Sequence, residues 1–395
     1  MKVSIDILGI IYIIAALQGF LLTILLFTKY RKSGANRYLA WLILLYSLYV
    51  IRVFLFSIPE IASRHAHLLM IFDGLPFLFG PLHLIYVGVL TDTRLAFAKP
   101  HWLHFAPFVI YRIYYLRIFF LSKEELNSII AQVSQGIIPL HIAISSTILA
   151  VQGLVYVTVA LIVFQEYSKK IKLTFSSLAR INLSWLRYFT LLALIVWIIV
   201  FVDNLTTILG FEVRPLFVLV PFLTSVFVYA TGYIGMFKTE IFLQSDIYEN
   251  IHSAKNLALE LGRSESGEKG SDKYKKSGLS DNDAEQYLEK LRLLMESEEV
   301  YTDPDITLRD ISDRSGISTH NISEVINTRL GQNFFDYINE YRIEKVKKDL
   351  VDRTRVHLTI FGIALDAGFN SKSGFNAIFK RFTGLTPSEY RRKVS

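Results

Sequence analysis

The sequence contains no cysteine, and this absence excludes several kinds of chemistry. Disulfides, thiol nucleophiles, cysteine-based zinc or iron–sulfur sites and redox sensing by thiols all require that residue. Charged residues are also scarce, at 19% of the 395 residues, whereas 52% are hydrophobic and the mean hydropathy is +0.38. Ordinary soluble enzymes of this length are less apolar. The composition therefore indicates a membrane protein.

The charges divide the chain into two unlike parts. Residues 1–240 carry 19 Lys and Arg against 10 Asp and Glu, whereas residues 241–395 carry 23 against 25. The apolar runs end near residue 240, and after them the composition changes abruptly. We therefore expect a transmembrane sensor domain at 1–240, a flexible linker with an amphipathic helix at 241–300, and a third domain at 301–395.

Seven apolar stretches in the first part are long enough to cross a hydrocarbon layer of about 30 Å. Continuous apolar runs satisfy their backbone groups in lipid by forming helices, so we predict an all-α fold that begins with a seven-helix bundle. The fourth stretch is unusual, because it contains Pro107, Arg112 and Arg117. The predicted spans are Ile7–Phe27, Tyr38–Ser57, Leu68–Leu90, Trp102–Leu121, Leu140–Phe164, Tyr188–Leu209 and Leu216–Phe237.

Basic residues in the short connections predict the orientation, because cytoplasmic loops retain Lys and Arg. The first, third and fifth connections hold eleven of them, more than the connections on the opposite side. The N-terminus is thus expected outside and the C-terminal half in the cytoplasm. The first apolar stretch precedes its positive cluster, which is typical of an uncleaved first helix and not of a secretory signal.

Ionisable residues inside membrane spans are costly and are candidates for function. On the predicted topology they lie in the outer half of the bundle, where they suit either a ligand pocket or ion pairs between helices. Ion pairing is the commoner outcome. The candidates are Arg52, Asp73, Arg112, His141, Asp203 and Asn204. The histidine spacing does not fit a metal site, and we expect no metal, no other cofactor and no catalytic residue.

The segment that follows the membrane part has two sections. Residues 262–283 are rich in Gly, Ser and charge, which predicts a flexible linker. From Ser280 an amphipathic helix is predicted, with Asp283 completing an approximate capping box. Its apolar stripe either packs on the domain that follows or pairs with a second copy as a short coiled coil.

From Ile306 onward the same pattern occurs twice: a capped short helix, a turn glycine, and a new helix with a serine cap. The turn glycines are Gly316 and Gly368. One helix-turn-helix pattern also occurs in ordinary bundles, but two in tandem with matched caps are a stronger indication. Residues 334–351 are predicted to form one connecting helix of about 27 Å. Two helix-turn-helix units on such a spacer could enter adjacent major grooves, about 34 Å apart.

Residues 305–393 resemble the AraC/XylS family of bacterial transcription regulators. The membrane part is similar to the multi-spanning N-terminal region that some members carry in place of a soluble sugar-binding domain. The C-terminal resemblance rests on Ile363-Ala364, Ala367 to Ser373, Phe375, Phe379 to Arg381, Gly384 to Pro387 and Tyr390-Arg391, with Asn339, Tyr341-Arg342 and Leu350 in the connecting helix. In the membrane part it rests on Phe79 to Leu82 and Tyr86.

The resemblance implies DNA contacts from both recognition helices. Lys372 can donate to guanine, Asn376 can bond adenine, and Glu324 can accept from cytosine. The implied base contacts are His320, Ser323 and Glu324 in the first helix and Lys372, Ser373, Asn376 and Ala377 in the second. The resemblance places Thr319 and Asn327 nearer the DNA backbone and Lys380 and Arg381 toward phosphates, and Ser371, the cap of the second helix, is a further candidate for DNA contact. Three residues depart from the family: Ser312 replaces a small apolar residue, Gly374 should cost about 1 kcal/mol relative to Ala, and Ala377 offers only a methyl group.

Charge separates the two copies. Residues 353–395 have a net charge of +6 and residues 301–352 of −3, so the second copy should supply most of the attraction to phosphates. The affinity of a monomer should be modest. A homodimer, formed through the 281–298 helix or the membrane bundle, would raise it through effective concentration.

The sequence thus predicts a transcription regulator in the bacterial cytoplasmic (inner) membrane, not an enzyme. Its expected partners are double-stranded DNA, the lipid bilayer, a second copy, and an extracytoplasmic or membrane signal. The alternative is a transporter or membrane receptor whose cytoplasmic tail regulates transcription secondarily. The sequence contains no nucleotide-binding loop and no nucleophile with a base at usable spacing, which argues against an enzyme. No internal repeat of the spans is visible, which argues against a transporter.

Overall fold

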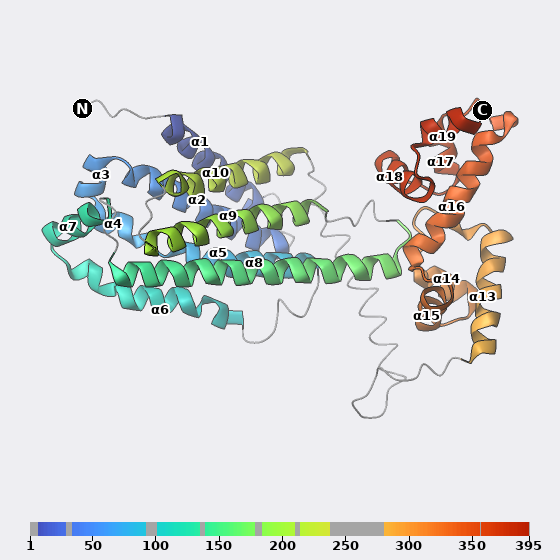
Figure 1. Cartoon of the computed structure of the whole chain (residues 1–395), viewed down its shortest axis with the longest axis horizontal. Coiled ribbons are helices and arrows are strands. Elements are labelled where there is room, and N and C mark those ends of the chain that lie inside the picture. The colour runs from blue at the N-terminus through green and yellow to red at the C-terminus, as the bar shows by residue number, and fades with distance from the viewer. Residues whose placement is uncertain are drawn as a thin grey trace. The chain divides into compact units, whose positions relative to one another are not determined.

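The computed structural model describes residues 7–28, 34–91, 101–134, 139–177, 184–209, 214–237, 280–355 and 357–394. Every regular element among these residues is a helix, which confirms the all-α prediction for them, and an isolated bridge joins Phe175 to Thr307. The chain divides into two compact units (Figure 1). The first unit contains residues 1–165 and 183–264, and the second contains residues 166–182 and 265–395.

Long apolar helices form the first unit. Figure 1 shows these helices side by side as a bundle. Helix α10 contacts α1, α2 and α9, and a Cβ added to Gly19 of α1 would lie 1.9 Å from Ser47 Oγ of α2, so these two helices approach closely. The principal helices are α1 (Ile7–Thr28), α2 (Gly34–Phe56), α5 (Phe79–Thr91), α8 (Leu140–Thr174), α9 (Ser184–Ile208) and α10 (Arg214–Phe237).

The bundle exposes apolar side chains and keeps small polar ones inside. On α8, Ile144, Ile148 and Val155 are each 52–55% exposed and recur along one face. Inside, the Ser47 hydroxyl donates to the Ile43 carbonyl and the Thr190 hydroxyl donates to the Leu186 carbonyl, so neither is left without a partner. Such a surface is typical of contact with lipid tails.

Five helical segments of the described residues are long and apolar enough to cross a membrane. They match the expected first, second, third, fifth and sixth spans. The expected seventh span falls in α10, whose described apolar section is the shorter Leu219–Thr231. The connections at 29–33 and 92–100, used to predict orientation, lie outside the described residues. The five segments are Ile7–Thr28, Ala35–Phe56, Ala66–Thr91, Leu140–Thr174 and Trp185–Ile208.

The expected fourth span is not a single helix. It is divided into η3 (His101–Phe105), α6 (Ala106–Tyr114) and η4 (Tyr115–Phe120), and Pro107 lies in the first turn of α6. A nine-residue helix is about 14 Å long, less than half of the hydrocarbon thickness. The third span is also divided, because α4 (Ala66–Ile71) and η1 (Leu75–Leu78) precede α5 within it. Helix α3 (Pro59–Arg64) lies before this span, and α7 (Lys123–Ser134) follows η4.

Short helices form the C-terminal part of the second unit. Helix α16 has the predicted bounds of the connecting helix and runs between the α14–α15 pair and the group α17 to α19 (Figure 1). The expected linker residues 241–279 lie outside the described residues. The elements are α13 (Asp281–Glu296), η5 (Val300–Thr302), α14 (Leu308–Ser315), α15 (Thr319–Leu330), α16 (Phe334–Val351), η6 (Arg353–Arg355), α17 (Ile360–Asp366), α18 (Lys372–Thr383) and α19 (Pro387–Val394).

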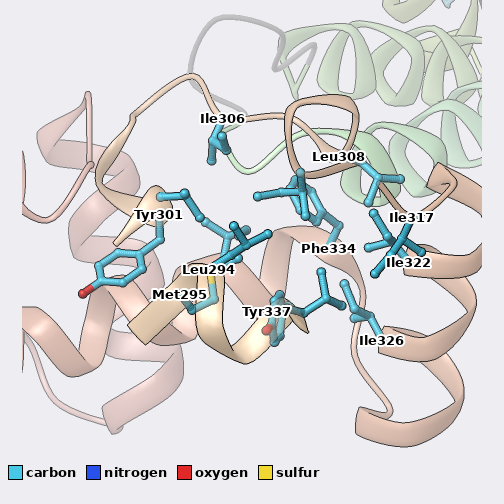
Figure 2. Close-up of a cluster of buried hydrophobic side chains, with 14 residues drawn as sticks. Leu294, Met295, Tyr301, Ile306, Leu308, Ile317, Ile322, Ile326, Phe334 and Tyr337 are labelled. Carbon is cyan, nitrogen blue, oxygen red and sulfur yellow. The ribbon is translucent and has the colours of Figure 1, made fainter. Parts of the chain in front are cut away.

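Two apolar clusters hold these helices together, one for each helix-turn-helix copy. The first joins Leu294 and Met295 of α13 to Ile322 and Phe334 (Figure 2). The second joins α16 to α17 and α18 through residues such as Phe375. Of the two alternatives for the amphipathic helix, the structure thus shows α13 packed on the domain that follows it.

Candidate nucleic-acid interface and membrane cavity

The local chemistry of the first copy explains its helix-turn-helix shape. At the start of α14, Thr307 Oγ1 accepts the Asp310 amide and the Asp310 carboxylate accepts the Thr307 amide, which completes a capping box. The helix ends at Gly316, whose φ of +68° favours glycine. Ser318 then starts α15 by accepting the Asn321 amide at 3.2 Å.

The second copy repeats this arrangement. Thr359 Oγ1 accepts the Gly362 amide at 3.0 Å, the turn contains Gly368 with a φ of +95°, and Ser371 Oγ accepts the Gly374 amide at 3.1 Å. Gly374 is thus the third residue of α18, in its capped first turn. The penalty of about 1 kcal/mol expected for glycine applies to a helix interior, so the cost here should be smaller.

We call α15 the first reader and α18 the second reader. The predicted contacts occupy the first, second, fifth, sixth and ninth positions of each helix, which lie on one helical face. Arg381 is the tenth residue of the second reader, and Ser371 is its half-buried cap. The corresponding residues are Thr319, His320, Ser323, Glu324 and Asn327 in the first reader and Lys372, Ser373, Asn376, Ala377 and Lys380 in the second.

The first reader presents a partly occupied surface. The His320 side chain is 81% exposed, but that of Glu324 is only 18% exposed and its carboxylate lies 3.6 Å from His320 Nδ1. Asn327 Nδ2 donates to the Ser323 carbonyl at 2.8 Å. Several polar groups of this surface therefore already have partners within the helix.

The second reader is more open. Lys372, Ser373, Asn376 and Lys380 are all exposed, so their polar groups face solvent. Arg381 behaves differently, because it pairs with Asp336 of α16 and lies 5.0 Å from the centre of the Phe382 ring. Its implied role at a phosphate therefore competes with an ion pair inside the domain.

Ser312, one of the three departures from the family pattern that the sequence resembles, has a structural role. Its hydroxyl donates to the Ile317 carbonyl at 2.6 Å and so closes the turn between α14 and the first reader. The equivalent residue in the second copy is the buried Ala364.

Sequence reasoning missed a buried polar network on α16. Asn339 and Arg342 are 0% and 1% exposed. Arg342 Nε donates to the Tyr301 carbonyl and Nη2 to the Asp303 carbonyl, each at 2.7 Å. Burial lowers the pKa of Arg342 to about 10, which leaves the guanidinium charged at neutral pH. Its remaining acceptors come from Ser176, a distant residue that no sequence pattern indicated.

The first unit contains a cavity of about 360 Å³, lined by four of the six predicted membrane residues: Arg52, Asp73, Asp203 and Asn204. Arg52 Nη2 donates to Asp73 Oδ1 at 2.8 Å, which is one of the ion pairs considered above, and the Tyr111 hydroxyl donates to the other carboxylate oxygen. Among the residues that the structure describes, the Asp203 carboxylate has no hydrogen bond or ion pair.

The other two predicted membrane residues do not line this cavity. Arg112 Nη1 donates to the carbonyls of Met70 and Asp73, both at 3.2 Å. The His141 carbonyl accepts from the Tyr115 hydroxyl at 3.2 Å. Within the described ranges, no group of three or more His, Asp or Glu side chains could hold a metal ion.

Known proteins resemble the C-terminal part. Residues 311–393 match the family model described as a helix-turn-helix domain. An HTH-type transcriptional regulator of Staphylococcus aureus (strain COL) is 38% identical over 93 residues, which are 24% of this chain and 12% of that protein. A protein of Streptomyces lividans described as a putative AraC-like transcription regulator is 28% identical over 86 residues, 22% of this chain and 27% of that protein.

A solved structure is also similar to part of this chain. The C-terminal domain of AraT, a response regulator from Geobacillus stearothermophilus, is 27% identical, and the match covers 30% of this chain and 88% of that chain with a TM-score of 0.23. The chain spans only 12% of the length of the Staphylococcus aureus relative, and the family model places a helix-turn-helix domain at residues 311–393.

Proposed function

We propose that this chain is a multi-pass protein of the bacterial inner membrane that regulates transcription by binding promoter DNA. The observation that carries this proposal is the pair of capped helix-turn-helix copies, whose readers place the implied DNA contacts at the same five helical positions. The five apolar helical segments, with apolar side chains on their outer faces, support its placement in lipid.

The proposed topology places the N-terminus outside and the DNA-binding residues in the cytoplasm. We assign residues 1–240 to a membrane sensor domain, 241–300 to a linker with α13, and 301–395 to a DNA-binding domain. Because the apolar stripe of α13 is used inside the second unit, a homodimer would have to form elsewhere, and the membrane bundle is the remaining expected site.

DNA contact is assigned to the exposed faces of both readers. The second reader supplies cations through Lys372 and Lys380, while Asn376 can bond adenine and Ala377 can contact the thymine methyl group. In the first reader, Thr319, His320, Ser323, Glu324 and Asn327 lie at the equivalent positions. Ser371 caps the second reader and is close enough to its N-terminus to contact the DNA backbone.

Genome-wide DNA capture with the full-length chain in its native membrane tests the proposal. Sequencing should recover a small set of promoters that share one motif, and Lys372→Ala together with Asn376→Ala should abolish their enrichment. Lys290→Ala, which removes an exposed cation from α13, is the matched control and should leave the set unchanged. Equal recovery of random genomic DNA by the wild type and the double variant would contradict a sequence-specific regulator.

We assign the signal to the cavity of the first unit. The charges of Arg52 and Asp73 compensate each other, which leaves the Asp203 carboxylate among rings such as Tyr49 and Trp197. A carboxylate beside aromatic faces suits a ligand with a positively charged group. Asp203→Asn should therefore weaken the promoter response to organic cations added outside the cell.

The same variant separates a sensor from a transporter. If Asp203→Asn abolished uptake of a radiolabelled organic cation and left the promoter response intact, the transporter alternative would be favoured. An altered response without any flux favours sensing. Leu149→Val, a conservative change in the lining of the same cavity, controls for general disturbance of the bundle.

A further inference from the structure

The short segment Phe175–Ser177 lies directly after α8 and belongs to the second unit. It is far in sequence from residues 265–395 of that unit, yet it contacts three parts of this C-terminal region. Phe175 forms an antiparallel bridge with Thr307, the cap of α14. Ser177 Oγ donates to Asn370 Oδ1 at 3.1 Å, next to the cap of the second reader. The segment therefore contacts both helix-turn-helix copies.

Its middle residue is bonded to the connecting helix. Ser176 is 1% exposed, and its carbonyl accepts from Asn339 Nδ2 at 2.9 Å and from Arg342 Nη1 at 3.3 Å. The Ser176 hydroxyl donates to the Ile306 carbonyl at 2.6 Å and accepts from Arg342 Nη2 at 3.2 Å. Only a hydroxyl can donate and accept in this way, so alanine at position 176 would lose both bonds.

The chemistry of Arg342 makes this contact specific. Among the described residues, no carboxylate lies within ion-pair distance of the Arg342 guanidinium. The guanidinium instead donates hydrogen bonds to three carbonyls and one hydroxyl. Two of these four acceptors belong to Ser176. A buried charge without such acceptors is unfavourable, so this surface of α16 requires either the segment or water.

We propose that Phe175–Ser177 is a docking segment. Through it, the DNA-binding domain at 301–395 binds a loop from the membrane half of the same chain. Through Thr307, Arg342 and Asn370 the segment fixes the first copy, the connecting helix and the second copy relative to one another. Since α8 continues directly into it, a rearrangement of α8 is transmitted to the spacing of the two readers.

The docked state is competent for DNA binding. The contacts described above, with Thr307, Ile306, Asn339, Arg342 and Asn370, use no exposed position of either reader, and Lys372, Ser373 and Asn376 are exposed to solvent. The segment therefore organises the readers and does not mask them. Its loss should weaken binding to DNA that engages both readers and leave binding through one reader unchanged.

The absence of cysteine makes docking directly measurable. In the full-length chain in lipid nanodiscs, Ser177→Cys combined with Asn370→Cys joins two side chains that already touch, and mild oxidation should give a rapid crosslink within one chain. Ser177→Cys combined with Arg329→Cys is the control pair, because Arg329 instead pairs with Asp281. A yield no higher than that of the control, or a crosslink between two chains, would overturn the docking.

The consequence for DNA rests on the proposed function and is tested separately. On a captured promoter fragment, Ser176→Ala in the full-length chain should lower the affinity about tenfold. On a fragment with one half of the site scrambled, the affinity should not change, which also shows that the readers remain folded. Equal affinities of wild type and variant on the intact fragment would overturn the coupling. Absence of DNA binding by the wild type would instead overturn the proposed function, while the crosslink still decides whether the segment docks.

Discussion

The two helix-turn-helix copies share their local chemistry and differ in their surroundings. Both start at a threonine cap and turn at a glycine with positive φ. A Cβ added to Gly316 would meet no atom within 4 Å, whereas one added to Gly368 would lie 2.5 Å from the Tyr301 carbonyl oxygen and 3.0 Å from Arg342 Nε. The first turn is thus open, and the second is pressed against η5 and the buried arginine.

The two copies also differ in net charge, and the basic copy is the one expected to supply most of the attraction to DNA phosphates. The second copy is basic, with a net charge of +6 over residues 353–395, and its Phe369 ring lies against the Arg342 guanidinium. The first copy has a net charge of −3 over residues 301–352 and is supported by α13. A repeated motif therefore does not imply an equal contribution, and single substitutions can separate the two copies.

The largest expected effect comes from the turn glycines. Gly368→Ala should destabilise the second copy by about 4 kcal/mol, because left-handed backbone strain adds to an overlap with backbone atoms that cannot move away. Gly316→Ala carries the strain alone and should cost about 1 to 2 kcal/mol.

Amide hydrogen exchange on the full-length chain measures both effects, because it reports local opening free energies. Gly368→Ala should accelerate exchange in α17 and α18, and Gly316→Ala should affect α14 and α15 only slightly. If the two variants lost equal protection, the crowding around Gly368 would not contribute to stability.

The second effect concerns the first position of each reader, which is Thr319 in one copy and Lys372 in the other. Lys372→Ala should weaken promoter binding by about 1 to 3 kcal/mol, because a cation that faces DNA is lost, and should reduce the salt dependence by about one counterion. Thr319→Ala should change neither clearly. Titrations at several salt concentrations with the full-length chain decide between these outcomes.

The reciprocal substitution sharpens this comparison. Thr319→Lys should raise affinity and steepen the salt dependence, because it places a cation at the first position of the first reader, where the second reader has Lys372. No change in either quantity would indicate that the first reader does not approach DNA.

A third, smaller effect concerns Ser312 and its equivalent Ala364. Ser312→Ala removes the hydrogen bond to the Ile317 carbonyl and should destabilise the first copy by about 1 kcal/mol. Ala364→Ser places a hydroxyl in an apolar cluster and should destabilise the second copy by a similar amount. Ser388→Ala, an exposed position in α19, is the control in the same exchange experiment. Increased protection in the Ser312 variant would show that the hydroxyl does not support the turn.

The sequence predicts well those features of each copy that depend on a few neighbouring residues. The caps Ser318 and Ser371, the turn glycines and the extent of α16 follow from local rules and agree with the structure. The contact of Ser176 with Arg342 joins residues 166 positions apart, and no local pattern encodes such a pairing. The broken fourth span was not predicted as broken, because hydropathy averages over a window that hides the effect of Pro107.

The smallest expected effect concerns the ion pairs that tie each reader to its neighbour. Arg329 of the first reader pairs with Asp281, which is 96% exposed, and Arg381 of the second pairs with Asp336, which is 27% exposed. An exposed pair contributes little, so Asp281→Asn should change neither stability nor DNA binding.

Asp336→Asn, in contrast, should strengthen DNA binding. The variant removes a negative charge near the second reader and releases Arg381, whose guanidinium also rests on Phe335 and Phe382 and therefore stays near the reader. A freed arginine at this position can reach a phosphate, so promoter affinity should rise by about threefold at low salt and the gain should shrink as salt increases. Because Asp336 also accepts a hydrogen bond from Asn333 at the start of α16, its loss should cost some stability. A variant that is less stable and yet binds DNA more tightly would show that Arg381 is held back from DNA in the free protein; weaker binding that parallels the lost stability would show that its place is structural.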